Sequence, residues 1–226
     1  MDVSIILPVY NEEATLGRVL DKLSALPLDK EIIVVDDAST DKSSEIMHGR
    51  QREVVHITQA KNQGKGAAIR AGIAVARGKV TVIQDADMEY DPDDIPRLVQ
   101  PILDGKADVV YGSRFTHGMH PKMALPNKIV NVLLTWFVRA LYFTKISDEA
   151  TCYKAFRTDV LRVMNLQCNR FEFCPEVTGK ALRMGYEIKE LPISYEPRSK
   201  SAGKKIRWTD GVEAFWTLLR HRFSKF

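Results

Sequence analysis

The sequence contains 226 residues, of which 45% are hydrophobic and 27% are charged, with a formal net charge of +4. This composition is ordinary for a globular protein and excludes a disordered chain, a collagen-like repeat and a coiled coil. The three cysteines, an odd number without a CxxC motif, exclude a disulfide scaffold and a cysteine-based zinc ribbon and indicate a reducing compartment. We expect a single domain with a short appendage.

The charge is unevenly distributed along the chain. Residues 197–226 carry eight Lys or Arg against two Asp or Glu, whereas the remainder is slightly acidic. A basic tail favours an anionic partner such as nucleic acid, a phosphate or a membrane surface. The first residues have the pattern of a strand and not of a signal peptide. No apolar run reaches the roughly 20 residues that a membrane-spanning helix needs.

In the first half of the chain, apolar runs of strand length alternate with segments of helical periodicity. Nearly continuous Ile/Val runs indicate strands buried on both faces, and their alternation with helices indicates right-handed βαβ units. We therefore predict an α/β fold with a doubly wound, mainly parallel sheet over about residues 1–115. The predicted strands are 3–9, 31–35, 54–58, 80–84 and 107–111, with helices over about 16–23, 40–49, 66–77, 125–144 and 211–223.

Ligands of a doubly wound sheet bind where the strands end. After the first strand, Tyr10 and Glu12 could hold a nucleoside, although a proline turn before a helix also explains them. After the second strand, Asp37 could accept from a ribose or a base edge, or could cap the next helix. After the third strand, Lys65 lies in KNQGKG at the start of a helix, where a phosphate could bind. This loop matches neither a P-loop nor a Rossmann fingerprint, so a plain turn is the alternative.

The clearest motif follows the fourth strand. Here Asp85, Asp87 and Glu89 are clustered in QDADMEYDPDD. Clustered carboxylates repel one another and raise each other's pKa, which does not favour stability. A hard divalent cation removes the repulsion, and carboxylate oxygens suit Mg²⁺ or Mn²⁺. The sequence therefore predicts a metal site formed by Asp87 and Glu89, with Asp85 nearby.

Three later features carry candidate chemistry. Arg114 follows the fifth strand and could bind a phosphate through two hydrogen bonds, or form a surface salt bridge. Glu176 falls in the first turn of a further predicted helix, where it stabilises the helix start or lies near an entering acceptor. The helix at 211–223 is amphipathic, aromatic and basic, which suits a membrane interface, although packing on the core is equally consistent with it.

Taken together, these motifs resemble glycosyltransferase family 2, which has the GT-A fold. The matching segments are ILPVYNEE, IIVVDDAST, NQGKGAAIRAG, QDADMEYDPDDIP, DVVYGSRF, DEATCYKAFR, FEFCPEVTGKALRMGYEIKELPISYEPR and GKKIRWTDG. Within the family, EATCYKAFR and the basic tail are most similar to the dolichyl- and polyprenyl-phosphate sugar synthases. The resemblance implies a single domain over 1–226, with a nucleotide-sugar half at 1–115, an acceptor half at 116–196 and a basic loop with an interfacial helix at 197–226.

The resemblance also implies a role for each candidate residue. Catalytic roles fall to Asp87, Arg114 and Glu176, and the metal ligands are Asp87 and Glu89. The acceptor phosphate would meet Arg198, Lys204 and Lys205. Glu89 departs from the family pattern, because relatives often carry Gln there. The donor-binding residues would be Pro8, Tyr10, Glu12, Asp37, Lys65, Asp85 and Ala86.

The implied reaction is inverting transfer of a hexose from a nucleoside-diphosphate sugar, of the GDP-mannose or UDP-glucose class, to a polyprenyl or dolichyl phosphate. It would need Mg²⁺ or Mn²⁺ and would occur at the cytoplasmic face of a membrane, bound peripherally or through an anchor subunit, with no nucleic-acid partner. Transfer to a saccharide or glycolipid hydroxyl is the alternative, and would need Asp148, Glu149 or Glu176 as a base. A nucleotidyltransferase or nucleotide-binding module is more remote, because PVYNEE is acidic where such proteins need a basic glycine-rich loop.

Overall fold

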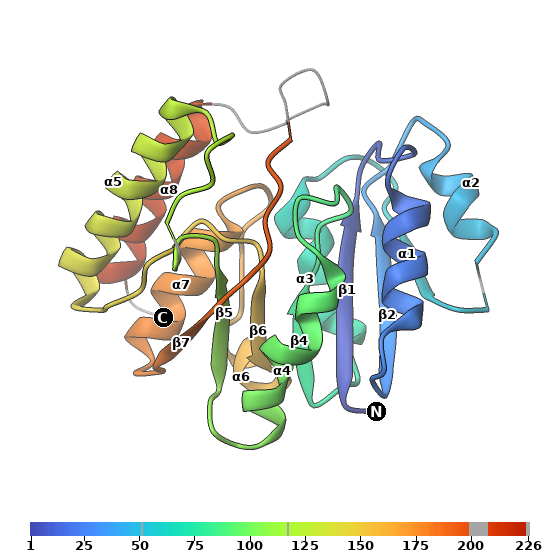
Figure 1. The fold of residues 1–226 in the computed structure, drawn as a ribbon, viewed down its shortest axis with the longest axis horizontal. Coiled ribbons are helices and arrows are strands. Elements are labelled where there is room, and N and C mark those ends of the chain that lie inside the picture. Colours follow the sequence, from blue (N-terminus) through green and yellow to red (C-terminus); the bar gives the residue numbers. More distant parts are fainter. Residues whose placement is uncertain (51, 117, 199–207, 225–226) are drawn as a thin grey trace.

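A computed structural model describes residues 1–50, 52–116, 118–198 and 208–224. A seven-stranded sheet with strand order β3-β2-β1-β4-β6-β5-β7 forms its centre, and helices flank it (Figure 1). The strands are β1 (Val3–Val9), β2 (Lys30–Asp36), β3 (Val55–Thr58), β4 (Val80–Ile83), β5 (Val109–Ser113), β6 (Lys154–Arg157) and β7 (Ile188–Pro192). The helices are α1 (Leu16–Ala25), α2 (Ser43–His48), α3 (Lys65–Val75), the short 3₁₀ helix η1 (Pro92–Asp94), α4 (Ile95–Leu103), α5 (Leu125–Tyr142), α6 (Thr158–Val163), α7 (Phe173–Arg183) and α8 (Trp208–Phe223).

Strand pairing in the sheet is mainly parallel. β1 pairs in parallel with β2 and β4, β2 with β3, and β5 with β7. β6 lies antiparallel between β4 and β5. The predicted doubly wound α/β fold is therefore confirmed, and β6 and β7 add two strands that the sequence pattern did not indicate.

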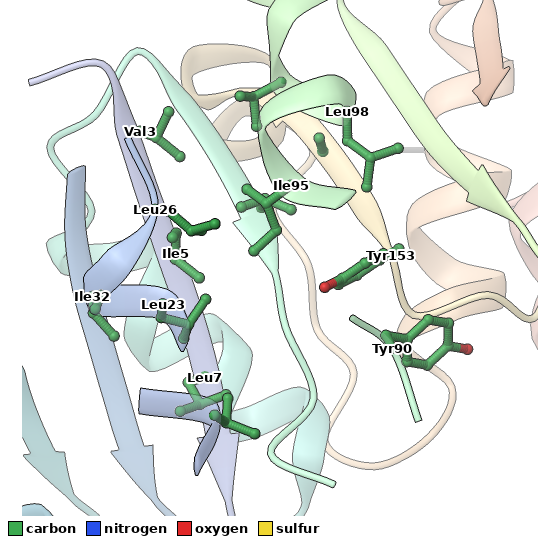
Figure 2. Packing of buried hydrophobic residues seen from close by; sticks show 14 of the residues in the cluster. Val3, Ile5, Leu7, Leu23, Leu26, Ile32, Tyr90, Ile95, Leu98 and Tyr153 are labelled. Atoms are coloured by element: carbon green, nitrogen blue, oxygen red, sulfur yellow. The ribbon is translucent and has the colours of Figure 1, made fainter. Parts of the chain in front are cut away.

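The sheet is buried on both faces. Val3, Ile5 and Leu7 of β1 pack in one cluster with side chains of α1 and α4, whereas Ile6 packs against α3 in a second cluster that also contains side chains of α7. Figure 2 shows the first of these layers, in which side chains of α1 and α4 lie against β1. Because neither face of β1 meets water, its sequence is apolar almost throughout and does not alternate.

A third, smaller core lies at one end of the molecule, where α5 and α8 run side by side (Figure 1). Leu134 and Val138 of α5 pack there with Leu218 of α8. The hydroxyl of Tyr142 donates to the carbonyl of Leu218 over 2.7 Å, which joins the two helices. Among the described helices, none is long and apolar enough to cross a membrane.

Candidate active site

The loops that follow β1, β2 and β4 meet at the carboxyl edge of the sheet. Each contains a non-glycine residue with a positive φ angle: Asn11 at 52°, Ala38 at 60° and Met88 at 61°. Such backbone conformations cost free energy and are concentrated at functional sites. The edge that the sequence predicted as the ligand site is thus also where the backbone is strained.

The first two loops are tied together by hydrogen bonds. The backbone amide of Asn11 donates to the Ser39 hydroxyl over 3.0 Å, and the Asn11 side-chain oxygen accepts from the Thr40 amide over 2.7 Å. Asp37 is buried, and its two carboxylate oxygens accept from the amides of Gln63 and Gly64, both over 2.7 Å. Asp37 therefore holds the loop before α3 in place. The contact of Asp37 with a nucleoside stays a prediction.

Lys65, at the start of α3, faces the loop after β4. Its ammonium lies 2.5 Å from a carboxylate oxygen of Asp85 and donates to the Cys152 sulfur over 3.0 Å. Burial alone would lower the pKa of Lys65, but the charge and hydrogen bond of Asp85, together with the neighbouring Cys152 and Cys174, hold this pKa well above its ordinary value. The two predicted donor-binding residues thus form a charged pair beside the carboxylate motif, and the adjoining Ala86 is buried.

Asp87 and Glu89 lie next to this pair. Burial, together with the charges of Asp85 and Glu89, raises the pKa of Asp87 to about 7. The backbone amide of Glu89 donates to the Asp87 carboxylate over 3.0 Å, so the two side chains start from one tight turn. This cluster concentrates negative charge in a partly buried place, which is the electrostatic setting that a divalent cation relieves.

The donor set fits Mg²⁺ or Mn²⁺ as a site that the substrate completes. Across the described ranges, no three His, Cys, Asp or Glu side chains form a ready metal-binding group. Mg²⁺ commonly takes one or two protein carboxylates and fills its other positions with water and substrate phosphates. Asp87 and Glu89 suit that arrangement, because Asp85 is already paired with Lys65.

Arg198 joins these loops from the far end of the chain. Its guanidinium lies 2.8 Å from the Glu12 carboxylate and donates to the Asp87 carbonyl over 2.8 Å, while its backbone amide donates to the Glu89 carboxylate over 2.8 Å. Burial opposes its charge, but the surrounding carboxylates raise its pKa. The structure thus brings Arg198 to the predicted metal and donor residues. Lys204 and Lys205 lie outside the described residues.

Arg114 is buried in a pair with Asp148. Two hydrogen bonds of 2.7 Å join the guanidinium to the two carboxylate oxygens, and a third of 3.2 Å reaches Asn131 on α5. The rings of Phe115 and Tyr195 lie 5.0 and 5.2 Å from the guanidinium carbon. The pair is buried and is therefore no surface salt bridge. The predicted contact of Arg114 with a phosphate stays a prediction.

Glu176 is bound by neighbouring groups of the fold itself. Its carboxylate lies 2.6 Å from Lys180 and accepts from the amides of Gln167 and Cys168 over 2.8 and 2.7 Å. Burial would raise the pKa of Glu176, but these hydrogen bonds and the Lys180 charge lower it. Because all its partners belong to the fold, the contacts of Glu176 favour its helix-stabilising alternative over the catalytic one.

Tyr195 is a residue of this site that the sequence motifs did not predict. Tyr195 forms an isolated bridge with Tyr90, stacks on Arg114, and donates to the Glu89 carboxylate over 3.4 Å. Only its position in PISYEPR, one of the family-like segments, pointed to this site.

A surface groove of about 450 Å³ lined by Gly78 and Arg157 lies at the opposite, amino edge of the sheet and takes no part in this arrangement.

The family model described as glycosyl transferase family 2 matches residues 4–164. The chain therefore belongs to this family and is a glycosyltransferase, as its motifs predict. It is 30% identical to undecaprenyl-phosphate mannosyltransferase of Micrococcus luteus, over 99% of this chain and 100% of that relative. It is 29% identical to the UDP-N-acetylglucosamine–dolichyl-phosphate N-acetylglucosaminyltransferase of Methanococcus voltae, over 99% and 97% of the two chains.

Other similarities are partial or concern the fold. The low-salt glycan biosynthesis hexosyltransferase Agl6 of Haloferax volcanii is 30% identical over 88% of this chain, but the chain spans only 49% of that relative. The crystal structure of glucosyl-3-phosphoglycerate synthase from Mycobacterium tuberculosis, in complex with Mn²⁺, UDP and phosphoglyceric acid, superposes with a TM-score of 0.77 at 21% identity, covering 100% of this chain and 80% of that one. At this identity the likeness shows the shared fold alone.

Proposed function

We propose that this chain transfers a hexose from a nucleoside-diphosphate sugar to the phosphate of a polyprenyl or dolichyl carrier, with inversion at the anomeric carbon. The two family members that align over nearly their whole length are named for polyprenyl-phosphate acceptors, which supports this acceptor class. The observation that carries the choice of a phosphate over a hydroxyl acceptor is the burial of the three candidate bases, Asp148, Glu149 and Glu176.

A hydroxyl acceptor must lose its proton as it attacks, so it needs an accessible base. Asp148 is buried and held by Arg114, and Glu176 is buried and held by Lys180. Glu149 is buried, and burial raises its pKa to about 8, so it is protonated at neutral pH. A phosphate acceptor is already anionic and needs no base. The state of these carboxyl groups therefore favours phosphate over a saccharide hydroxyl.

In the proposed reaction, an oxygen of the acceptor phosphate forms a bond to the anomeric carbon while the bond from that carbon to the donor diphosphate breaks. The anomeric carbon develops oxocarbenium character, and negative charge grows on the leaving diphosphate. Asp87 and Glu89 would hold Mg²⁺ or Mn²⁺, which when bound neutralises charge on the diphosphate. Lys65 and Arg198 lie beside these carboxylates and would contribute positive charge to the same place.

Glu12 and Asp37, with Pro8 and Tyr10, would orient the nucleoside, because Pro8 lies at the end of β1 and the other three follow β1 and β2 directly. Arg198, with Lys204 and Lys205, would attract the acceptor phosphate. We place the enzyme at the cytoplasmic face of a membrane, held peripherally or by an anchor subunit, because the proposed acceptor is a membrane lipid. The proposed donor is a nucleoside-diphosphate sugar of the GDP-mannose or UDP-glucose class.

The test is label transfer by the purified protein with Mg²⁺ or Mn²⁺, using GDP- and UDP-sugars with and without a polyprenyl phosphate in detergent. We expect label in the lipid with one donor, and none after addition of EDTA. The matched control is Asp87→Asn, which keeps the shape of the side chain and removes its charge. Transfer to a saccharide hydroxyl with none to the lipid phosphate would overturn the proposed acceptor.

A further inference from the structure

Two of the three cysteines lie beside Lys65, one of the predicted donor-binding residues. Cys152, in the loop before β6, accepts from the Lys65 ammonium over 3.0 Å, and its backbone amide donates to the Tyr90 hydroxyl over 3.3 Å. Cys174 is the second residue of α7, and its sulfur lies 3.5 Å from the carbonyl oxygen of Thr151, the residue before Cys152. The two thiols also form a hydrogen bond with each other. The fold therefore brings two thiols from different elements into contact at the wall of the candidate active site.

The surroundings of these two thiols favour one negative charge on the pair. The hydrogen bond from Cys152 lowers the pKa of Cys174 to about 6. Burial and the charge of Asp85 oppose this shift, whereas the positive charges of Lys154 and Lys65 contribute to it. The same hydrogen bond and burial raise the pKa of Cys152 well above its ordinary value. The start of a helix, where Cys174 lies, also stabilises a thiolate. At neutral pH the pair therefore holds a thiolate at Cys174 and a thiol at Cys152.

The third cysteine, Cys168, differs from this pair in every respect that governs reactivity. Cys152 and Cys174 are half-buried, whereas Cys168 is buried. Burial, together with the charge and hydrogen bond of Glu176, raises the pKa of Cys168. Cysteines that respond to oxidants are accessible, ionise easily and have a second thiol nearby that resolves the first product. Of the three cysteines, only Cys152 and Cys174 meet these conditions.

We propose that Cys152 and Cys174 are a modification site, at which a peroxide closes a reversible disulfide beside Lys65. The Cys174 thiolate attacks one oxygen of hydrogen peroxide, the O–O bond breaks, and the departing hydroxide takes up a proton and becomes water. The Cys152 sulfur then attacks the sulfur of the Cys174 sulfenic acid. The S–S bond forms, the S–O bond breaks, and a second water leaves with the Cys152 proton. The two sulfurs together lose two electrons, which the peroxide gains. A small thiol reverses the reaction by exchange, which suits a compartment that keeps thiols reduced.

The disulfide changes the charge around Lys65. It replaces the negative charge of the reduced pair with a neutral bond, and leaves Asp85 as the carboxylate paired with the Lys65 ammonium. With less negative charge beside it, this ammonium attracts a diphosphate more strongly. Oxidation should therefore tighten the binding of a nucleoside diphosphate. This consequence rests on the proposed function, whereas the modification itself does not.

The modification is tested by counting free thiols after the reduced protein is exposed to hydrogen peroxide at neutral pH and then denatured. We expect the wild type to fall from three free thiols to one, with Cys152 joined to Cys174 in the peptide map, and dithiothreitol to restore all three. Cys168→Ser is the matched control and should form the same disulfide at the same rate. Cys152→Ser should stop at a Cys174 sulfenic acid, which dimedone captures, and Cys174→Ser should react about tenfold more slowly or less.

Three outcomes would overturn the proposed modification site. The first is retention of all three thiols in an excess of peroxide. The second is a disulfide between molecules, seen on a non-reducing gel, in place of one within the chain. The third is reaction of Cys168 ahead of the pair.

The consequence for the donor site is tested by calorimetric titration of GDP or UDP, with Mg²⁺, into the reduced and the oxidised protein. We expect the Kd of the oxidised form to be about threefold to tenfold lower. Cys152→Ser/Cys174→Ser is the control, and its Kd should be the same before and after peroxide. If the disulfide forms and the Kd is unchanged, the coupling to Lys65 is wrong and the modification site stands. If neither form binds a nucleoside diphosphate, the proposed function fails, and the thiol count alone decides the modification site.

Discussion

Asp87 shows a conflict between stability and function at a single residue. Its pKa is raised to about 7 by burial and by the neighbouring carboxylates of Asp85 and Glu89. A group whose charged form is this disfavoured destabilises the folded chain when it ionises. Such a cost is understandable where charge is needed to hold a cation.

Asp87→Asn should therefore be inactive and at least as stable as the wild type. The amide removes the repulsion but is a poor metal ligand, so we expect kcat to fall by about 100-fold or more while the melting temperature stays equal or rises. Label transfer and thermal unfolding measured on the same preparation check both parts. Asp93→Asn, at an exposed acid paired with Lys22, should change neither. A less stable Asp87→Asn would contradict the electrostatic account.

The raised pKa of Glu149 predicts that the stability of the protein depends on pH. Its two side-chain oxygens are buried without a hydrogen-bond partner, and desolvation raises its pKa to about 8, although Lys154 opposes the shift and Cys174 and Asp148 add to it. The unfolded chain ionises this group first, so the folded state loses stability as pH rises from about 4.5 to about 8. Glu149→Gln should thus gain stability over the wild type across that window, by up to about 5 kcal/mol at its upper end.

Glu176→Gln is the opposite case and serves as the control. The pKa of Glu176 is lowered, because its hydrogen bonds and Lys180 outweigh burial. Its contribution to stability is present above the unfolded pKa and is lost as pH falls through the lowered folded pKa. This variant should be destabilised at neutral pH, with the difference shrinking in acid. Urea unfolding at several pH values would distinguish the two; parallel curves for both variants would contradict the assignments.

At the level of elements, sequence periodicity was sufficient for β1 to β5 because buried parallel strands are long apolar runs. It was not sufficient for β6, where Lys154 interrupts the pattern; that lysine is fully buried, with its ammonium 3.6 Å from the centre of the Tyr111 ring. β7 was missed because it is partly exposed at the sheet edge. The site residues after the strands were predicted by topology, whereas the partners of Arg114 and Arg198 lie far away in sequence and could not be.

Gly64 controls how the loop after β3 meets α3. Its φ angle is 101°, and a Cβ there would lie 2.5 Å from the Asn169 carbonyl oxygen. Gly64→Ala should therefore lose stability by more than the about 1–3 kcal/mol of backbone strain alone, and it should weaken donor binding because Asp37 and Lys65 flank this turn. Gly105→Ala is the control, since its φ is 68° but a Cβ would meet nothing within 4 Å. Chemical denaturation and nucleotide titration measure the two effects; equal losses at both positions would contradict the clash.

The Arg114–Asp148 pair joins the end of β5 to the loop before β6. Asp148→Ala should destabilise the protein by about 3–5 kcal/mol, because it leaves a buried guanidinium without its counter-charge. Arg114→Met/Asp148→Leu should recover much of this loss, since removing both charges removes the desolvation problem. Activity of the double variant then tests the predicted role of Arg114. An active double variant would make the arginine structural, and an inactive but stable one would support contact with a phosphate.

At the scale of the whole molecule, the site is assembled from segments distant in sequence. Glu12 follows the first strand, Asp87 follows the fourth, and Arg198 comes from after the seventh, yet Arg198 bonds to both. None of these contacts lies within a single helix or strand. The site therefore exists only when the sheet is complete, and a ligand that binds it should stabilise the fold as one unit.

Donor binding should accordingly raise the temperature of unfolding in a single transition. At 100 times its Kd, a ligand that binds only the folded state stabilises it by about 2.7 kcal/mol, or about 5–10 °C for a chain of this size. The shift should require both nucleoside diphosphate and Mg²⁺ or Mn²⁺, because Asp87 and Glu89 lack a third described ligand of their own and depend on the diphosphate to complete the site. Differential scanning fluorimetry with each component alone and with both tests this, with Asp87→Asn as the control. A full shift from the metal alone would mean that the protein already supplies a complete cation site, and a full shift from the nucleotide alone would mean that Lys65 and Arg198 bind the diphosphate without a cation.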